Sequence, residues 1–267
     1  MRVTVIQNNP QDDEGQSLSA LGDLIARASE QGTDLIALPE YYAFMGNTVI
    51  EHRDAGARFD EINGRMAEFA RTNAVAIHAG SLAELRGNRT YNTTVVHGAD
   101  GAELARYSKM HMFDIELPTG EVIRESDIIS RGDRVVTYSL NGWTIGCTIC
   151  YDLRFPELFR ALRDQGAELI LVPSAFMLDT GRDHWEVLLR ARAIETGCYI
   201  AAPGQVFRHA KGARACFGHS LVADPWGHVV AQASDTVGFV TAALDRGYMN
   251  TVRARIPVHN HHVLQRG

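Results

Sequence analysis

The sequence contains the same helix–strand pattern twice. Residues 20–40 (ALGDLIARASEQGTDLIALPE) and 158–174 (LFRALRDQGAELILVPS) each combine a helical spacing of apolar residues, a glycine, an acidic residue and an apolar strand that ends at a proline. Any helix–strand unit shares part of this pattern, so one ordinary α/β sheet would explain it. A pseudo-symmetric fold explains it equally well, with two equivalent sheets that each present residues at the carboxyl end of a strand.

The rest of the chain also alternates strands and helices. Asn141-Gly142 between two apolar runs is a strong hairpin signal, and residues 248–267 show no clear periodicity. No linker, low-complexity tract or change of composition interrupts residues 1–267, so we expect one α/β domain. The predicted strands are 3–7, 34–39, 74–78, a hairpin over 91–107 that turns at 98–101, 135–140, 144–149, 198–203, 219–223, 228–233 and 237–245, and the predicted helices are 17–31, 59–73 and 183–196.

Composition and charge limit the classes of partner. The hydrophobic fraction of 45% and the charged fraction of 22% are typical of a soluble globular protein. The net charge of −6, without a Lys/Arg-rich run, argues against a nucleic-acid partner. No run approaches the ~20 apolar residues of a membrane span, and the strand-like first residues predict no signal peptide. Four scattered cysteines are too few for a disulfide framework, so we expect a reducing, cytoplasmic location.

Cys150 lies directly after the predicted strand 144–149 and shortly before a helix that we expect to start near Pro156. A thiol in such a turn is held on a rigid scaffold while it faces a cleft, which suits covalent catalysis. A single cysteine is more often a packed, buried thiol. The choice between these interpretations depends on whether the chain also supplies a base and a cation.

Glu40 and Lys109 provide these groups. Glu40 follows the predicted strand 34–39, in which Pro39 ends the ladder, and Lys109 follows another strand-like run. With Cys150 they form a complete set for acyl transfer: a base that takes the thiol proton, a cation that favours the thiolate and later the oxyanion, and a nucleophile. Each residue alone is compatible with a solvated or structural role, but the combination favours catalysis.

In this order and context, the three residues resemble the Glu–Lys–Cys triad of the nitrilase (carbon–nitrogen hydrolase) superfamily. The resemblance extends from Val3 to about Val263. It implies an α-β-β-α four-layer sandwich that forms a homodimer or a higher even homo-oligomer, and we expect no cofactor and no metal ion. The most specific segments are LPEYYAFMG (38–46), YSKMHMFDIELP (107–118), CYDLRFPELFR (150–160), PSAFMLDTG (173–181), HWEVLLRARAIET (184–196) and GHSLVADPWG (218–227).

The resemblance also implies roles for residues around the triad. Many members of the superfamily carry a second glutamate that orients the lysine. Glu125 is the main candidate for this residue, and Glu116 and Glu121 are alternatives nearer in sequence. The backbone N–H of Tyr151 would join Lys109 in the oxyanion hole.

Within the superfamily the chain is most similar to the Nit branch. This similarity implies an amidase that releases ammonia from a small ω-amide acid, such as deaminated glutathione, through a thioester. We expect Tyr42, Phe44 and Phe176 to wall a narrow pocket and Arg154 to help shape the cleft. Four residues are candidates for binding a substrate carboxylate or for an ordinary solvated loop: Arg208, His209, Arg214 and His219.

Several alternatives stay open at this point. An ω-amidase for 2-oxoglutaramate, a nitrilase and an N-carbamoyl hydrolase share the same triad, and a ligand-binding scaffold protein of the same fold is the non-enzyme alternative. The C-x-x-C spacing of Cys147 and Cys150 and the run 259–262 (HNHH) are typical of redox or metal sites. We interpret Cys147 as a core residue and the histidines as part of a solvated or dimer-covering tail.

Overall fold

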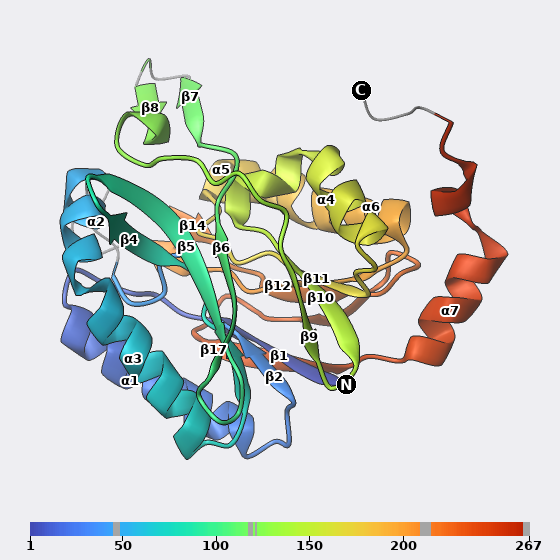
Figure 1. Cartoon of the computed structure of the whole chain (residues 1–267), viewed down its shortest axis with the longest axis horizontal. Helices are drawn as coiled ribbons and strands as arrows, with labels where there is room; N and C mark the ends of the chain where they lie inside the picture. Colours follow the sequence, from blue (N-terminus) through green and yellow to red (C-terminus); the bar gives the residue numbers. More distant parts are fainter. Residues whose placement is uncertain (45–48, 117–119, 121, 209–214, 264–267) are drawn as a thin grey trace.

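Two β-sheets stacked face to face form the centre of the protein (Figure 1). The computed structural model describes residues 1–44, 49–116, 120, 122–208 and 215–263. The first sheet has the order β17-β1-β2-β3-β5-β4, with β6 also paired to β5, and the second has the order β16-β15-β12-β11-β10-β9.

The strands of both sheets are short and mostly match the predicted runs. The first sheet comprises β1 (Arg2–Gln7), β2 (Leu35–Ala37), β3 (Ala76–His78), β4 (Leu82–Arg86), β5 (Arg89–His97), β6 (Glu103–Ser108) and β17 (Gly238–Ala243). The second comprises β9 (Thr137–Leu140), β10 (Trp143–Cys147), β11 (Leu169–Leu171), β12 (Tyr199–Ala202), β15 (Leu221–Ala223) and β16 (Val229–Gln232). Two further hairpins are formed by β7 (Asp114–Glu116) with β8 (Val122–Arg124) and by β13 (Val206–Arg208) with β14 (Ala215–Phe217).

In each sheet, three neighbouring strands run parallel, and one of them comes from the repeated sequence pattern. β1, β2 and β3 are parallel in the first sheet, and β10, β11 and β12 in the second. β2 follows helix α1 (Glu14–Ser29) and β11 follows helix α4 (Pro156–Asp164), so the two repeats occupy equivalent places. The pseudo-symmetric interpretation of the repeat is therefore confirmed.

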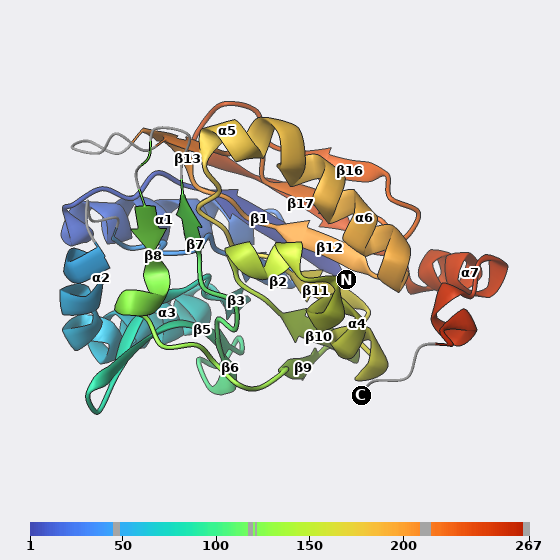
Figure 2. The same cartoon turned by 90° about the horizontal axis from the view of Figure 1, so that it is seen from above.

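Helices cover the outer face of each sheet (Figure 2). Helices α1 and α3 (Phe59–Thr72) pack on the first sheet, and α4 and α6 (Glu186–Thr196) pack on the second. The strands explain this arrangement because their side chains alternate between two faces. In β2, Leu35 lies between the sheets while Ile36 packs under α1 and α3, and Ile170 of β11 packs under α4 and α6 in the same way. The predicted α-β-β-α sandwich is confirmed.

Local sequence signals set where the helices start. The carboxylate of Asp13 caps α1 by accepting the N–H of Gln16 at 2.9 Å, and Pro156 is the first residue of α4, as predicted. The helix predicted over 183–196 becomes α-helical only at Glu186, since Gly181–Trp185 form a π-helical turn that follows the short α5 (Leu178–Thr180).

Some elements were not predicted, most clearly helix α7 (Arg246–Arg255) in the tail. Its N-terminus is capped by Asp245, but only Met249 and Val252 of the helix are buried. Two buried positions are too few to produce a visible apolar period. Strand β4, the β7–β8 and β13–β14 hairpins and helix α2 (Val49–Ala55) were also missed.

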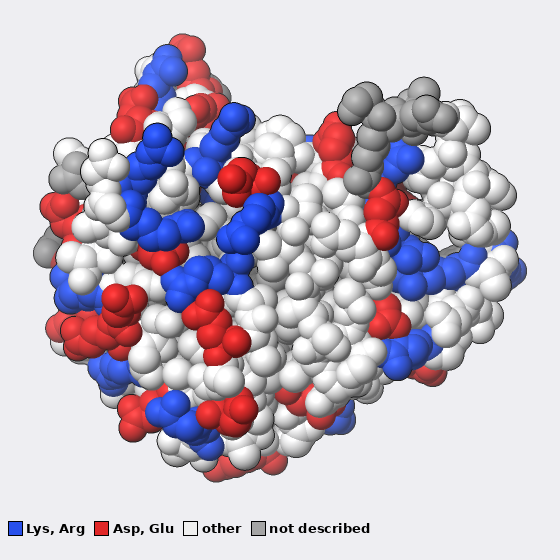
Figure 3. All heavy atoms as spheres, in the orientation of Figure 1, with Lys and Arg blue, Asp and Glu red and all other residues white. Residues whose placement is uncertain are grey.

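Acidic and basic side chains intermingle on the face seen in Figure 3, over α3 and β4–β6. Within the part of the chain that the structure describes, none of the helices has the length and apolar character required to span a membrane.

His78, the last residue of β3, is fully buried beside Tyr138, a residue of the core between the sheets. Its Nδ1 lies 3.3 Å from the Tyr138 hydroxyl, and its Nε2 has no hydrogen-bond partner among the described residues. Burial disfavours the charged imidazolium and lowers the pKa of His78 to about 3.

We expect stability to fall as the pH drops from the unfolded-state value of 6.5 for this histidine toward 3. In that range the unfolded chain binds a proton that the native protein excludes, so protonation favours unfolding. Protonation of this single histidine in the unfolded chain should lower the free energy of unfolding by about 2 kcal/mol between pH 6.5 and pH 5. Urea unfolding of the wild type and of His78→Gln at pH 7 and pH 5 measures the effect. The same pH dependence in both proteins would contradict the assignment.

Candidate active site

Glu40 lies just beyond the carboxyl end of β2, after Pro39, and its side chain is buried. Both carboxylate oxygens accept hydrogen bonds: Oε1 from Asn92 Nδ2 at 2.9 Å and Oε2 from the backbone N–H of Ala175 at 3.0 Å. Gly80, with a φ of +39°, passes so close that a Cβ there would overlap the carbonyl oxygen of Pro39. Glu40 is therefore fixed by contacts from both sheets.

Lys109 follows β6, and its ammonium group lies between two carboxylates. Nζ donates to Glu40 Oε1 at 3.1 Å and to Glu125 Oε1 and Oε2 at 3.1 and 2.9 Å, and the Lys109 side chain is only 3% exposed. Burial opposes the positive charge, but Glu125 and Glu40 outweigh it, so the pKa of Lys109 lies well above its usual range. The site therefore contains a fixed cation.

Of the three glutamates considered for orienting Lys109, the structure places Glu125 beside it. Glu125 opens the short 3-10 turn Glu125–Asp127, and its Oε2 also accepts the backbone N–H of Phe113 at 2.7 Å. Glu116 lies on an exposed position of β7, and Glu121 lies outside the described residues.

Cys150 begins the 3-10 turn Cys150–Arg154 that follows β10, in a left-handed conformation with a φ of +45°. Its N–H donates to the carbonyl oxygen of Pro173 at 2.8 Å, just beyond β11. Burial raises the pKa of the Cys150 thiol and the Glu40 carboxylate raises it further, whereas Lys109 acts in the opposite direction. The resting thiol thus keeps its proton next to a carboxylate that can accept it.

The ends of strands from both sheets meet where Glu40, Lys109 and Cys150 lie. β2 and β6 of the first sheet deliver Glu40 and Lys109, and β10 of the second delivers Cys150. The structure therefore brings together the four residues for which a catalytic role was predicted, with Glu125 contributed by the segment between β8 and β9.

Asn92 of β5 was not identified from the sequence. Its side chain donates to Glu40, and its carbonyl oxygen accepts the backbone N–H of Lys109 at 2.9 Å. The run Asn92-Thr93-Thr94 is polar yet buried on both faces of the strand, which is an unusual pattern. That pattern indicates a polar site near β5 but does not single out Asn92.

Tyr42, which was predicted to wall the pocket, is a core residue. Tyr42 is 1% exposed and packs in the core between the first sheet and its helices. The preceding residue, Tyr41, adopts a φ of +51°, and it lies near the charged groups: burial, Glu125 and Glu40 all raise the pKa of its hydroxyl. Tyr42 thus packs on the helix side of the first sheet with Ile36 and Leu38, whereas Tyr41 lies beside the charged residues.

Phe176 and Arg154, also predicted as pocket residues, lie next to each other. The guanidinium carbon of Arg154 is 5.3 Å from the ring centre of Phe176 and 5.8 Å from that of Tyr151. Phe176 is buried, with its ring 5.1 Å from that of Trp185. Phe44 is half-buried. Arg154 is therefore positioned on an aromatic surface in the same turn as Cys150.

The four loop residues considered for carboxylate binding are only partly described. Arg208 is exposed at the end of β13. The Nε2 of His219 lies 3.1 Å from Asp235 Oδ1, so its ring is engaged by an acidic partner. His209 and Arg214 lie outside the described residues.

The remaining cysteine and histidine motifs lie outside this cluster. Cys147 is buried in the core between the sheets, and all four cysteines are free. His259 Nδ1 lies 3.5 Å from Asp164 Oδ1. In the described ranges, no group of three or more His, Cys, Asp or Glu side chains is arranged to hold a metal ion.

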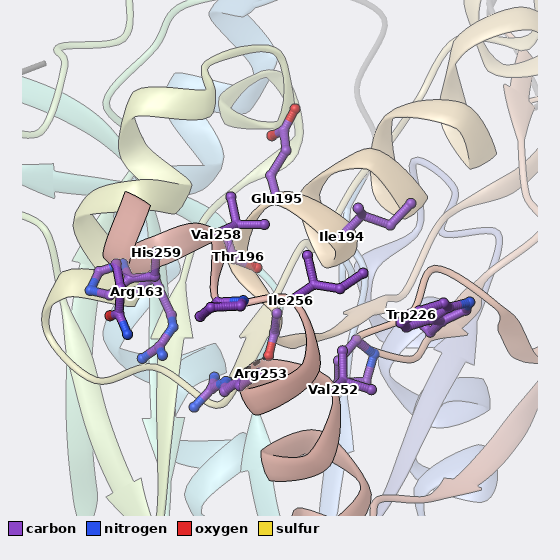
Figure 4. Close-up of a pocket in the computed structure, with 14 residues that line it drawn as sticks. Arg163, Ile194, Glu195, Thr196, Trp226, Val252, Arg253, Ile256, Val258 and His259 are labelled. Carbon is purple, nitrogen blue, oxygen red and sulfur yellow. Dashed lines mark hydrogen bonds between the residues drawn. The ribbon is translucent and has the colours of Figure 1, made fainter. Parts of the chain in front are cut away.

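A separate pocket of about 240 Å³ lies between the end of α6 and the α7 region (Figure 4). One side is apolar, with Ile194, Trp226 and Ile256, and the other carries Arg163 and Arg253 (Figure 4). The candidate catalytic residues do not line it. This pocket is therefore distinct from the candidate active site.

Comparison with known proteins agrees with this geometry. The model of a family described as carbon-nitrogen hydrolase matches residues 2–254. The chain belongs to the carbon–nitrogen hydrolase family. This carbon–nitrogen hydrolase is 38% identical over 253 residues to a deaminated glutathione amidase of Synechocystis sp., a match that covers 93% of each chain.

Solved structures extend the comparison. The carbon–nitrogen hydrolase superposes on the NitFhit protein of C. elegans with a TM-score of 0.92 and 37% identity, and the match covers 98% of this chain but 65% of NitFhit. It superposes on an amidase of Nesterenkonia sp. AN1 with a TM-score of 0.82 and 27% identity, covering 96% and 98% of the two chains. In that structure, acrylamide has added to the active-site cysteine. The protein is thus an amidase-type enzyme of the nitrilase superfamily.

We expect iodoacetamide to modify Cys150 much faster than the other cysteines. Cys147, Cys198 and Cys216 are buried, whereas Cys150 is half-buried and lies beside Glu40, which can take its proton, and Lys109, which favours the thiolate. Peptide mass spectrometry of samples taken over time measures each rate. Equally slow labelling of all four thiols would support the ligand-binding scaffold instead of an enzyme.

Proposed function

We propose that this carbon–nitrogen hydrolase cleaves the amide bond of a small ω-amide acid of the deaminated glutathione type and releases ammonia. The observation that carries the proposal is the buried arrangement of Glu40, Lys109 and Glu125 beside Cys150. It combines a base, a fixed cation and a nucleophile within one site. The name of the Synechocystis relative supports the substrate class.

In the first half of the reaction, Glu40 takes the proton of Cys150 as the sulfur attacks the amide carbon. The carbonyl electron pair moves to the oxygen, and Lys109 Nζ with the backbone N–H of Tyr151 stabilises the oxyanion. When the carbonyl re-forms, the C–N bond breaks and Glu40 gives its proton to the leaving nitrogen. Ammonia departs, and a thioester to Cys150 remains.

In the second half, Glu40 takes a proton from a water molecule that attacks the thioester carbon. Lys109 and Tyr151 again stabilise the oxyanion. Collapse of this intermediate breaks the C–S bond, Glu40 returns its proton to the sulfur, and the carboxylic acid product leaves. Glu125 forms two hydrogen bonds with Lys109 Nζ throughout, which keeps the ammonium oriented. Loss of one oxyanion donor raises a barrier of this type by roughly 3–4 kcal/mol.

Replacing Cys150 with alanine should reduce ammonia release by at least about 10⁴-fold, because no thioester forms. The thermal unfolding temperature should stay close to that of the wild type, since the thiol is only half-buried. Cys147→Ala is the matched control: it removes a core thiol and should lower stability while keeping the turnover number. Near-normal turnover by Cys150→Ala would contradict the thioester mechanism.

Arg154 is our candidate for binding the carboxylate of the substrate. Its guanidinium packs on Tyr151 and Phe176, and its Nη1 lies 3.3 Å from His184 Nδ1. A planar guanidinium held on aromatic rings suits bidentate recognition of a carboxylate. Arg154 belongs to the same turn as Cys150. A substrate whose carboxylate binds Arg154 would therefore place its amide group near the Cys150 sulfur.

An ammonia-release screen tests the substrate class. We expect the highest kcat/KM for deaminated glutathione, compared with 2-oxoglutaramate, simple amides, nitriles and N-carbamoyl amino acids. Arg154→Met keeps an unbranched apolar stem and removes the guanidinium charge, so it should raise KM for the acidic amides about tenfold or more and leave neutral amides unaffected. Faster turnover of 2-oxoglutaramate, a nitrile or an N-carbamoyl compound would assign the corresponding alternative activity. Equal effects of Arg154→Met on acidic and neutral amides would contradict the role of Arg154.

We also propose a homodimer, or a higher even oligomer, formed through α6 and α7. Helix α7 projects from the body of the molecule in both ribbon views (Figures 1 and 2). Ile256 after this helix is 51% exposed, and Ile194 of α6, across the pocket of Figure 4, is 52% exposed. Neighbouring exposed apolar side chains favour a subunit contact.

The double substitution Ile194→Asp/Ile256→Asp should shift the protein toward the monomer, because it places charges in the apolar contact. Light scattering coupled to size-exclusion chromatography measures the mass. Val122→Asp, at a position that is 52% exposed on β8, serves as the control and should leave the mass unchanged. A monomeric wild type, or an unchanged mass of the double variant, would contradict this interface.

The state of the cysteines supports the predicted cytoplasmic location. All four are free, and Cys150 has to remain a thiol to react. A reducing compartment maintains that state.

A further inference from the structure

We propose that the carboxylate of Asp152 clasps the segment around Lys109 to the Cys150 turn and so sets the position of the Lys109 ammonium relative to the thiol. The inference rests on the proposed function, because it gives Asp152, Tyr107 and His111 a part in activating Cys150. These three are positioning residues: they act through Lys109 and Cys150. We refer to their hydrogen bonds as the Asp152 clasp.

Asp152 is fully buried, and both of its carboxylate oxygens accept hydrogen bonds. Oδ2 accepts the hydroxyl of Tyr107 at 2.6 Å and the backbone N–H of Ile149 at 2.9 Å. Oδ1 accepts the backbone N–H of His111 at 3.1 Å, and it lies 2.7 Å from His111 Nδ1. A buried carboxylate with this set of partners is strongly fixed in place.

The partners of Asp152 are arranged symmetrically around the two reactive residues. Tyr107 and His111 lie two positions before and two positions after Lys109, and Asp152 lies two positions after Cys150. Tyr107 belongs to β6 of the first sheet, whereas the Cys150 turn follows β10 of the second. The clasp thus holds both flanks of Lys109 against the turn that carries the nucleophile.

Capping of its own turn alone does not account for the hydrogen bonds that Asp152 forms with Tyr107 and His111. The bond to the Ile149 N–H suffices for such a cap, and a neutral side chain would form it without the cost of burying a charge. The same two segments are joined a second time, since the His111 ring stacks on Phe155 with centres 3.7 Å apart and planes 7° from parallel. Both contacts link the Lys109 segment to the turn.

The position of Lys109 bears directly on the thiol. Besides burial, the Glu40 carboxylate raises the pKa of Cys150, whereas Lys109 and the backbone of Ala175 lower it, and Tyr41 also lies within electrostatic range. If these hydrogen bonds are lost, the ammonium group of Lys109 is no longer held close to the Cys150 thiol. A smaller fraction of Cys150 is then thiolate at a given pH. Alkylation of Cys150 then requires a higher pH.

The test is the pH profile of Cys150 alkylation by iodoacetamide in Tyr107→Phe and His111→Phe. Each variant removes one donor to Asp152 and keeps an aromatic ring in place. We expect the rate at pH 7 to fall about tenfold and the profile to move to higher pH, with a lower kcat and an unchanged KM. Tyr138→Phe is the matched control, because Tyr138 is another buried tyrosine of the same core whose hydroxyl contacts His78 instead of Asp152. Its profile should equal that of the wild type.

Unchanged profiles in Tyr107→Phe and His111→Phe would overturn the clasp while the proposed amidase stands. An equal shift in Tyr138→Phe would also overturn it, since any loss of core polarity would then have the same effect. Slow alkylation of Cys150 in the wild type itself would contradict the proposed function, and the clasp with it.

Discussion

The buried ammonium group of Lys109 between Glu40 and Glu125 is the interaction on which the site depends. An ammonium removed from water is stable only when opposite charges and hydrogen-bond acceptors replace its hydration, and here two carboxylates do so. Two negative charges around one positive charge would themselves be costly. Donors from Asn92, Ala175 and Phe113 to the carboxylate oxygens offset that excess. The charge cluster therefore fixes the loops that follow several strands at once.

The nucleophile adds a second constraint. Cys150 is in the left-handed region, which costs a residue other than glycine about 1–3 kcal/mol. The bond from its N–H to Pro173 and the Asp152 carboxylate in the same turn hold this conformation. Because Cys150 is in the left-handed conformation, the extended backbone of β10 ends in a turn. The thiol of Cys150 then lies beside Glu40, a residue of the first sheet. The site exists only when the two sheets are packed together.

The sequence predicts the layers because the relevant information is local and periodic. Leu35 and Ile36 in β2 show which faces are buried, and the repeated helix–strand unit indicates a second sheet of the same kind. Glu40 and Cys150 were recognised because each follows an apolar strand, and Lys109 because it follows a strand-like run, all three in a family-like context. Their proximity in the structure agrees with that prediction, whereas their catalytic roles stay proposals.

Other features depend on geometry that no local pattern encodes. Tyr41 adopts a positive φ beside the charged residues, although neither glycine nor asparagine marks that turn. Asn92 belongs to a strand that is polar on both buried faces, so alternation does not distinguish it from its neighbours. The bonds from Tyr107 and His111 to Asp152 join residues more than 40 positions apart. Such contacts follow from the tertiary fold.

The pairing of β1 with β17 has a consequence for how the chain acquires its fold. These strands are antiparallel neighbours along their whole length, and the hydroxyls of Thr4 and Thr241 meet across 237 positions of sequence. During synthesis β1 emerges first, but its partner emerges after every other strand of both sheets. One edge of β1 thus stays open until every other strand of both sheets has been synthesised, a situation in which exposed strand edges favour wrong pairing. Completion of the first sheet is therefore a late, long-range step in folding.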